Sequence, residues 1–257
     1  MINLQDKSYY FRLFLFFIIE FLISQILGNL ITIKIGHFAP WALIVCKTTE
    51  LLVILGLNAW LLHQRLYFHH LKRDTIIILV GIFAILIWIV FQNEMIYRIP
   101  AAITIGLLGA LPEEVMVRGV ALGSLLAHMS GKWLRTRAVI LSSLVFALLH
   151  LGNLTMQSFP ATITQAVNAF ASGCLFAALY LRAGNLLAPI IAHFGLDFVA
   201  TLGSSNANPF SIVSNYQRGE WVSDLIQFIL QILIAILLMT LGSKQRRDRL
   251  SSQLAGH

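Results

Sequence analysis

Long runs of apolar residues recur along almost the whole chain, and they restrict its fold more than any other feature. A membrane-spanning helix needs about 20 consecutive, mostly apolar residues. Eight stretches approach or meet this requirement: residues 11–33, 41–62, 75–91, 101–127, 138–152, 162–181, 186–203 and 222–241. The fifth and the seventh are short, and full crossing is not required of them. The sequence therefore predicts an all-α, polytopic transmembrane bundle of about eight spans.

The composition agrees with a membrane protein. Hydrophobic residues make up 58% of the 257 residues and charged residues only 11%, whereas soluble domains carry about 25% charged residues. Nearly all of the length is used in crossing lipid, so we expect residues 1–257 to form a single membrane domain. The net charge of +7 is then a topology signal and not a sign of nucleic-acid binding.

The cationic residues fall mostly on one side of the predicted bundle. With eight spans, 13 of the 18 Lys and Arg residues lie on the side that holds both termini, and only 3 lie on the other. The side richer in Lys and Arg is normally cytoplasmic. We therefore predict that both termini are cytoplasmic and that the first apolar run is a retained span of a multi-pass membrane protein.

Several ionisable residues interrupt the apolar runs. Each costs at least about 2.5–3.5 kcal/mol at the centre of a bilayer, so such residues usually pair or take part in chemistry. They occur in three short patterns, Glu113-Glu114-x-x-x-Arg118, Phe146-x-x-x-His150 and His193-x-x-x-Asp197. Counting 1.5 Å per helical residue places all three patterns near the middle third of the membrane, where they can converge.

Spacing suggests a division of labour in the first pattern. Glu114 and Arg118 share a helical face and can form a structural ion pair, whereas Glu113 points about 100° away. Purely structural readings also exist: an internal ion cluster, a hydrogen-bonded His150 and a polar His193–Asp197 pair. In the second predicted span Lys47 and Glu50 can pair with each other, either as a contact between helices or as a polar lining for water or substrate.

One carboxylate and two histidines at a common depth suit the activation of water. Glu113 can take a proton from water, while the histidines orient that water or stabilise an oxyanion. Alternatively, His150, His193 and Glu113 can hold Zn²⁺. Both routes lead to hydrolysis of a peptide bond within the membrane.

The three patterns, in this order on successive spans, resemble the motifs of the CAAX protease and bacteriocin-processing (CPBP, or Abi) family of intramembrane endopeptidases. The resemblance covers about residues 101–200, which would form the catalytic core. It implies that Glu113 activates water with help from His150, and that His193 and the residue at position 197 form the oxyanion site. The family often has Asn at that last position, and an ionised Asp197 accepts hydrogen bonds but cannot donate them. Asp197 is therefore expected either to be protonated or to orient His193 instead.

The resemblance also suggests partners. It favours a peptide or membrane-protein substrate in the lipid bilayer and bacteriocin self-immunity or peptide processing, ahead of cleavage of prenylated CAAX tails. It favours a reaction that needs no cofactor, with Zn²⁺ as the alternative. Two other hypotheses stay open: a non-catalytic immunity protein that sequesters a peptide or shields its receptor, and a transporter with an ion site at the midplane.

Overall fold

A computed structural model describes residues 4–35, 40–68, 96–204 and 221–241, with isolated positions between 73 and 88 and residues 252–253. Within these ranges the chain is helical and contains no strand, which confirms the predicted all-α class. Six of the described helical segments are long and apolar enough to cross a membrane. The helix in the seventh predicted stretch is shorter, and of the third stretch, 75–91, only isolated positions are described.

The elements follow the predicted spans closely. The first two spans are α1 (Leu4–Ile35) and α2 (Pro40–Leu57), which ends in the π-helix η1 (Asn58–Leu62). The fourth is a composite of η2 (Ile96–Arg98), α4 (Ile99–Glu114), the π-helix η3 (Val115–Leu122) and α5 (Gly123–His128). The fifth is α6 (Leu134–Leu149) with the 3₁₀ turn η4 (His150–Thr155), and α7 (Phe159–Ala183), α8 (Leu187–Gly203) and α9 (Trp221–Thr240) complete the series.

Local signals mark the ends of α7. Ser158 caps its first turn by accepting a hydrogen bond from the Ala161 N–H, and Pro160 occupies the first turn, where a missing N–H costs nothing. Gly184 ends the helix with φ 66°, a left-handed conformation that glycine adopts without strain. These signals confine α7 to 25 residues, about the length of one span.

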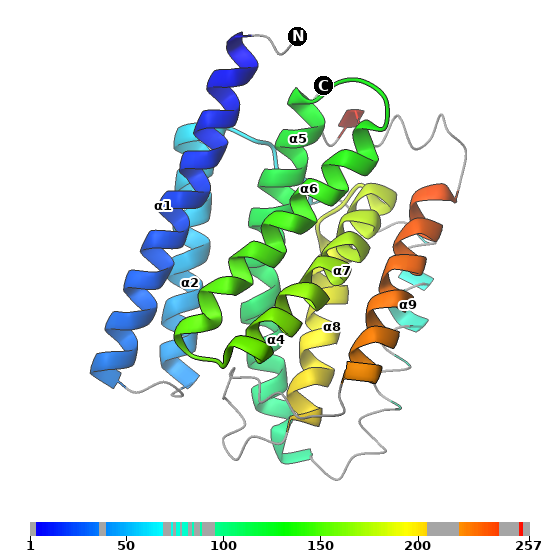
Figure 1. Cartoon of the computed structure of the whole chain (residues 1–257). Helices are drawn as coiled ribbons and strands as arrows, with labels where there is room; N and C mark the ends of the chain where they lie inside the picture. Colours follow the sequence, from blue (N-terminus) through cyan, green and yellow to red (C-terminus); the bar gives the residue numbers. More distant parts are fainter. Residues whose placement is uncertain are drawn as a thin grey trace.

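The helix α7 lies inside the bundle and the first, second and last helices lie at its edge. In an apolar 18-residue stretch of α7, 67% of the residues are buried, against 17% in the corresponding stretches of α1, α2 and α9. The most extensive contacts join α4 to α8 and α7 to both α6 and α9, while α2 links α1 to α4 (Figure 1). The short helix α8 is therefore held within the bundle by α4 and α7, which explains how a helix too short for a clear span can carry buried polar residues.

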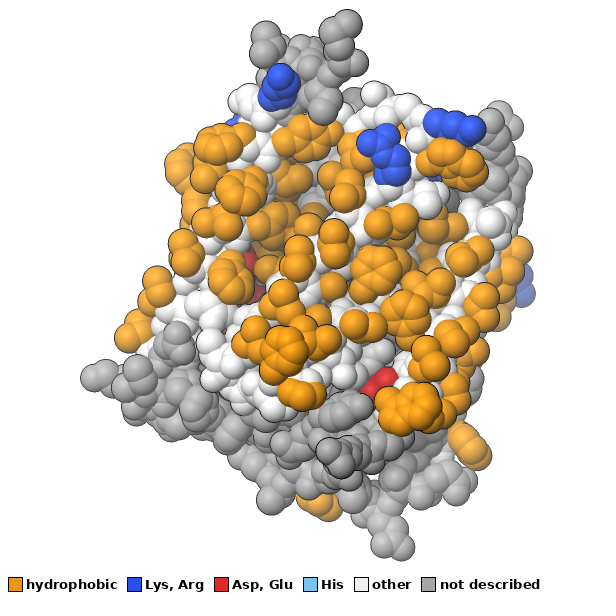
Figure 2. Space-filling view, in the orientation of Figure 1, with side chains coloured by type: hydrophobic (Ala, Val, Ile, Leu, Met, Phe, Trp, Pro, Cys, Tyr) orange, Lys and Arg blue, Asp and Glu red, His pale blue; other side chains and the backbone are white. Residues whose placement is uncertain are grey.

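The outer surface is that of a protein in lipid. Figure 2 shows apolar side chains over most of the visible face, with Lys and Arg gathered mainly near its upper end. Apolar residues such as Phe14, Leu52 and Leu233 are more than half exposed. Exposure of so much apolar surface is unfavourable in water but not in the hydrocarbon core of a bilayer. The helix α1 begins and α9 ends at the same end of the bundle (Figure 1).

Candidate active site

The carboxyl end of α4 carries the two adjacent glutamates. Pro112 lies inside this helix and has no N–H to donate, and directly after Glu114 the chain changes from α-helical to π-helical winding. All eight residues of η3 are buried. Segments of π-helix occur mostly as single-turn bulges inside α-helices, frequently at functional sites. The change in winding directly after Glu114 therefore indicates a functional site at the same place as the ionisable residues.

Glu114 and Arg118 form a completely buried ion pair. Arg118 Nη1 lies 3.0 Å from Glu114 Oε1, and neither side chain is exposed. The guanidinium also donates through Nη2 to the Gly173 carbonyl at 3.2 Å. Its central carbon stands 4.5 Å and 5.2 Å from the ring centres of Phe146 and Phe176. Through these contacts Arg118 joins η3 to α6 and α7. Removing either partner of the ion pair would leave the other as an uncompensated buried charge.

His193 on α8 joins the ion pair to the rest of the cluster. Its Nδ1–H donates to Glu114 Oε1 at 2.9 Å, since an ionised carboxylate can only accept. Its Nε2 faces two other carboxylates, at 3.5 Å from Asp197 Oδ2 and 3.9 Å from Glu113 Oε2. The Phe176 ring stacks on the imidazole with the ring centres 4.8 Å apart. Glu114 therefore holds one edge of the His193 ring and Phe176 one face, while Asp197 faces the opposite edge.

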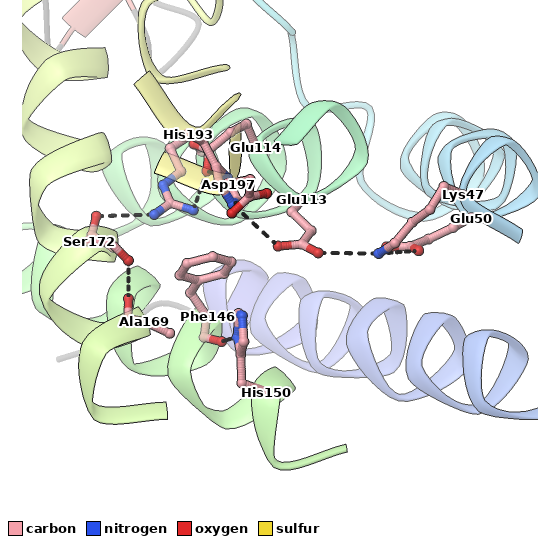
Figure 3. Close-up of polar contacts among 12 residues, drawn as sticks. Lys47, Glu50, Glu113, Glu114, Phe146, His150, Ala169, Ser172, His193 and Asp197 are labelled. Atoms are coloured by element: carbon pink, nitrogen blue, oxygen red, sulfur yellow. Dashed lines mark hydrogen bonds and ion pairs between the residues drawn. The ribbon is translucent and has the colours of Figure 1, made fainter. Parts of the chain in front are cut away.

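Glu113 has a different environment from its neighbour. Its side chain is 21% exposed, whereas that of Glu114 is 0% exposed. Its Oε1 accepts a hydrogen bond from the Lys47 ammonium at 3.2 Å, and Lys47 is in turn 2.9 Å from Glu50 Oε2 (Figure 3). Sequence reasoning paired Lys47 with Glu50 but did not connect either to Glu113. The first pattern contains two glutamates and one arginine. This excess of one acid indicated that Glu113 needs a cationic partner from elsewhere in the chain.

His150 reaches the cluster from the junction of α6 and η4. Its Nδ1–H donates to the Phe146 carbonyl at 2.8 Å, one turn earlier, and the two rings meet edge to face. A neutral imidazole with hydrogen on Nδ1 presents Nε2 as an acceptor. The Phe146 ring meets both imidazoles edge to face, with its centre 4.7 Å from that of His150 and 5.7 Å from that of His193. Figure 3 shows this ring between His150 and the Glu114 side of the cluster. The structure thus brings Glu113, His150, His193 and Asp197 into one region.

Sequence reasoning named His150, His193 and Glu113 as the ligands of a metal, should one be present. Among the residues that the structure describes, no group of three or more His, Cys, Asp or Glu side chains is arranged to hold a metal ion. The ring nitrogens Nδ1 of both histidines already have protein partners. In this arrangement the three side chains do not form a ligand set.

Comparison with known proteins gives one match. A family model described as type II CAAX prenyl endopeptidase Rce1-like matches residues 94–199. The matched region contains the Glu113, Phe146 and His193 patterns, and it leaves out α2 with Lys47 and Glu50. No curated protein and no solved structure matches the chain.

Proposed function

We propose that Glu113 is the residue that activates water for peptide-bond hydrolysis. Residues 94–199 match the Rce1-like model of the CPBP family. This match indicates a CAAX-type intramembrane endopeptidase. The observation that carries this proposal is the contrast between two adjacent carboxylates. Glu114 is fully buried and bonded to both Arg118 and His193, whereas Glu113 is partly exposed and directs Oε2 toward His193. Of these two glutamates, Glu113 is the one with access, and its Oε2 lies beyond hydrogen-bond distance from His193 Nε2, at 3.9 Å.

This geometry supports the following reaction. Glu113 Oε2 takes a proton from water while the water oxygen bonds to the scissile carbonyl carbon, and His150 Nε2 accepts the second hydrogen bond of that water. The carbon–nitrogen bond then breaks, and the proton on Glu113 passes to the leaving nitrogen. His193 supports the oxyanion through Nε2, which requires hydrogen on both ring nitrogens. Asp197, at 3.5 Å, orients that imidazole.

Replacement of Glu113 by Gln tests the proposal. Purified wild-type protein in detergent is expected to cleave a farnesylated peptide with a CAAX terminus or an unlipidated apolar peptide. Glu113→Gln is expected to lose activity by roughly 100-fold or more, because the amide cannot take the proton, while it accumulates in the membrane as the wild type does. Retention of full activity by Glu113→Gln would contradict the proposal. Comparing the two peptides shows whether a prenyl group is required.

We also propose that the reaction needs no metal. Dialysis against EDTA, followed by the same cleavage measurement, is expected to leave the rate unchanged. A loss of activity that added Zn²⁺ restores would show that the histidines and Glu113 rearrange around a metal. Treatment of Glu113→Gln in parallel separates an effect on the reaction from background peptide hydrolysis.

The proposed biological setting is bacteriocin self-immunity or peptide processing in a bacterial plasma membrane. One observation favours a non-catalytic version of it: Lys47 pairs with Glu113, so the whole cluster can also act as an internal ion network. An immunity protein that only binds its peptide, or shields a receptor, would keep full protection in Glu113→Gln at matched expression. An enzyme would lose cleavage and protection together, and the same variant therefore separates the two hypotheses.

A further inference from the structure

The helix α2 adds a buried ion pair to the site from outside the matched family region. Lys47 and Glu50 are three residues apart and lie on one face of α2. The Lys47 ammonium is 2.9 Å from Glu50 Oε2 and 3.2 Å from Glu113 Oε1. We propose that Lys47 is a positioning residue that fixes the Glu113 carboxylate in its reactive orientation, and that Glu50 anchors Lys47. This inference rests on the proposed role of Glu113.

The two oxygens of Glu113 have separate partners, which is why the contact matters. Lys47 engages Oε1, and Oε2 is then the oxygen directed toward His193. A glutamate side chain released from such a contact regains rotamer freedom. Because a reacting group displaced by about 1 Å can slow a reaction by about 100-fold, the ammonium contributes by selecting the orientation in which Oε2 is free.

Burial strengthens the interaction beyond that of a surface pair. The side chains of Lys47 and Glu113 are each 21% exposed and that of Glu50 is 12% exposed. In such surroundings a charge pair is screened less than on a wetted surface. An ionisable pair within a span is also costly to insert. An internal Lys47–Glu50 pair would hold no other helix, but the contact with Glu113 ties α2 to the end of α4.

The experiment compares Lys47→Met, Lys47→Arg and, as a matched control, Arg182→Met. Arg182 carries the same charge but lies in the last turn of α7, where it donates to the Leu241 carbonyl at an exposed position outside the cluster. Lys47→Met is expected to lower kcat by roughly 10- to 100-fold with little change in KM, Lys47→Arg to recover part of the loss, and Arg182→Met to behave as the wild type. Full kcat in Lys47→Met would overturn the inference.

Chemical rescue tests whether the ammonium group itself, and not only a side chain of similar size, is required at position 47. In a background with Cys46 and Cys174 replaced by Ala, Lys47→Cys is alkylated with 2-bromoethylamine, which rebuilds an ammonium of nearly lysine length. Activity is expected to rise on alkylation and not on treatment with iodoacetamide. Equal response to both reagents would contradict positioning by charge.

Two double-mutant cycles complete the test. If Glu50 acts through Lys47, Glu50→Gln lowers kcat less than Lys47→Met does, and the double variant is no slower than Lys47→Met alone. The thermal stability of Lys47→Met, Glu113→Gln and their double variant measures the pair without any catalysis. Additive stability effects would refute the contact itself. An active Glu113→Gln would instead refute the proposed function while this cycle still decides whether Lys47 and Glu113 interact.

Discussion

The two adjacent glutamates, Glu113 and Glu114, have different partners because their side chains point in different directions from one helix. Glu113 and Glu114 differ by about 100° in direction, and the structure places one beside Lys47 and the other between Arg118 and His193. The pairing of Glu114 with Arg118 is local and could be read from their spacing. The contact between Glu113 and Lys47 joins residues 66 positions apart, and helical periodicity contains no information about it.

Asp197 allows a sharper test of the oxyanion region. Its carboxylate stands beside His193 Nε2, and an asparagine there can still accept from the imidazole through its carbonyl oxygen while adding an N–H donor. Asp197→Asn is therefore expected to retain most of the cleavage rate, whereas Asp197→Leu is expected to lose roughly 10-fold or more because His193 is no longer oriented. Steady-state peptide cleavage measures both. Equal losses in the two variants would show that the negative charge itself is required.

At the scale of elements, the site depends on how closely α4 approaches α8. A Cβ built on Gly106 would lie 2.9 Å from a ring carbon of Phe194 and 3.1 Å from its backbone oxygen, and one on Gly109 would lie 2.9 Å from Asp197 Oδ2. Gly173 likewise brings α7 against Ser143 of α6. Small residues thus permit the approach of helices that carry the polar groups.

Alanine at the two α4 glycines is expected to have separable effects. Gly106→Ala must push the α8 backbone away, so it is expected to lower both thermal stability and activity. Gly109→Ala meets only the end of a flexible side chain, so it is expected to lower activity while the protein stays close to wild-type stability. Gly56→Ala on α2, where nothing lies within 4 Å of the added carbon, is the matched control. Unchanged cleavage in Gly109→Ala would contradict a role for the Asp197 carboxylate position.

The whole molecule is a bundle in which an apolar surface surrounds a polar interior. Six described spans and the short α8 account for seven of the eight predicted stretches, and the structure describes only isolated positions of the remaining one, 75–91. Hydrophobic length was enough to locate the spans. The side of the membrane on which each end lies is a separate prediction from the distribution of Lys and Arg.

Thiol labelling of intact cells tests the predicted sidedness. In a background without Cys46 and Cys174, a cysteine at Ser130, in the connection between α5 and α6, is expected to react with an impermeant maleimide only after the cells are opened. A cysteine at Thr155, at the opposite end of α6 and η4, is expected to react in intact cells. The reverse pattern would show that the termini are outside, because both positions follow from the same span count.

Apolar run length, charge asymmetry and three short motifs were sufficient to predict a membrane bundle with Glu113, His150, His193 and Asp197 near one depth, because hydrophobicity and helical periodicity are properties of local sequence. The tertiary structure decided which partner each ionisable group has. It placed His193 between Glu114 and the other carboxylates, and it brought Lys47 of α2 to Glu113. Contacts between helices depend on packing across many residues, and no spacing within a single helix encodes them.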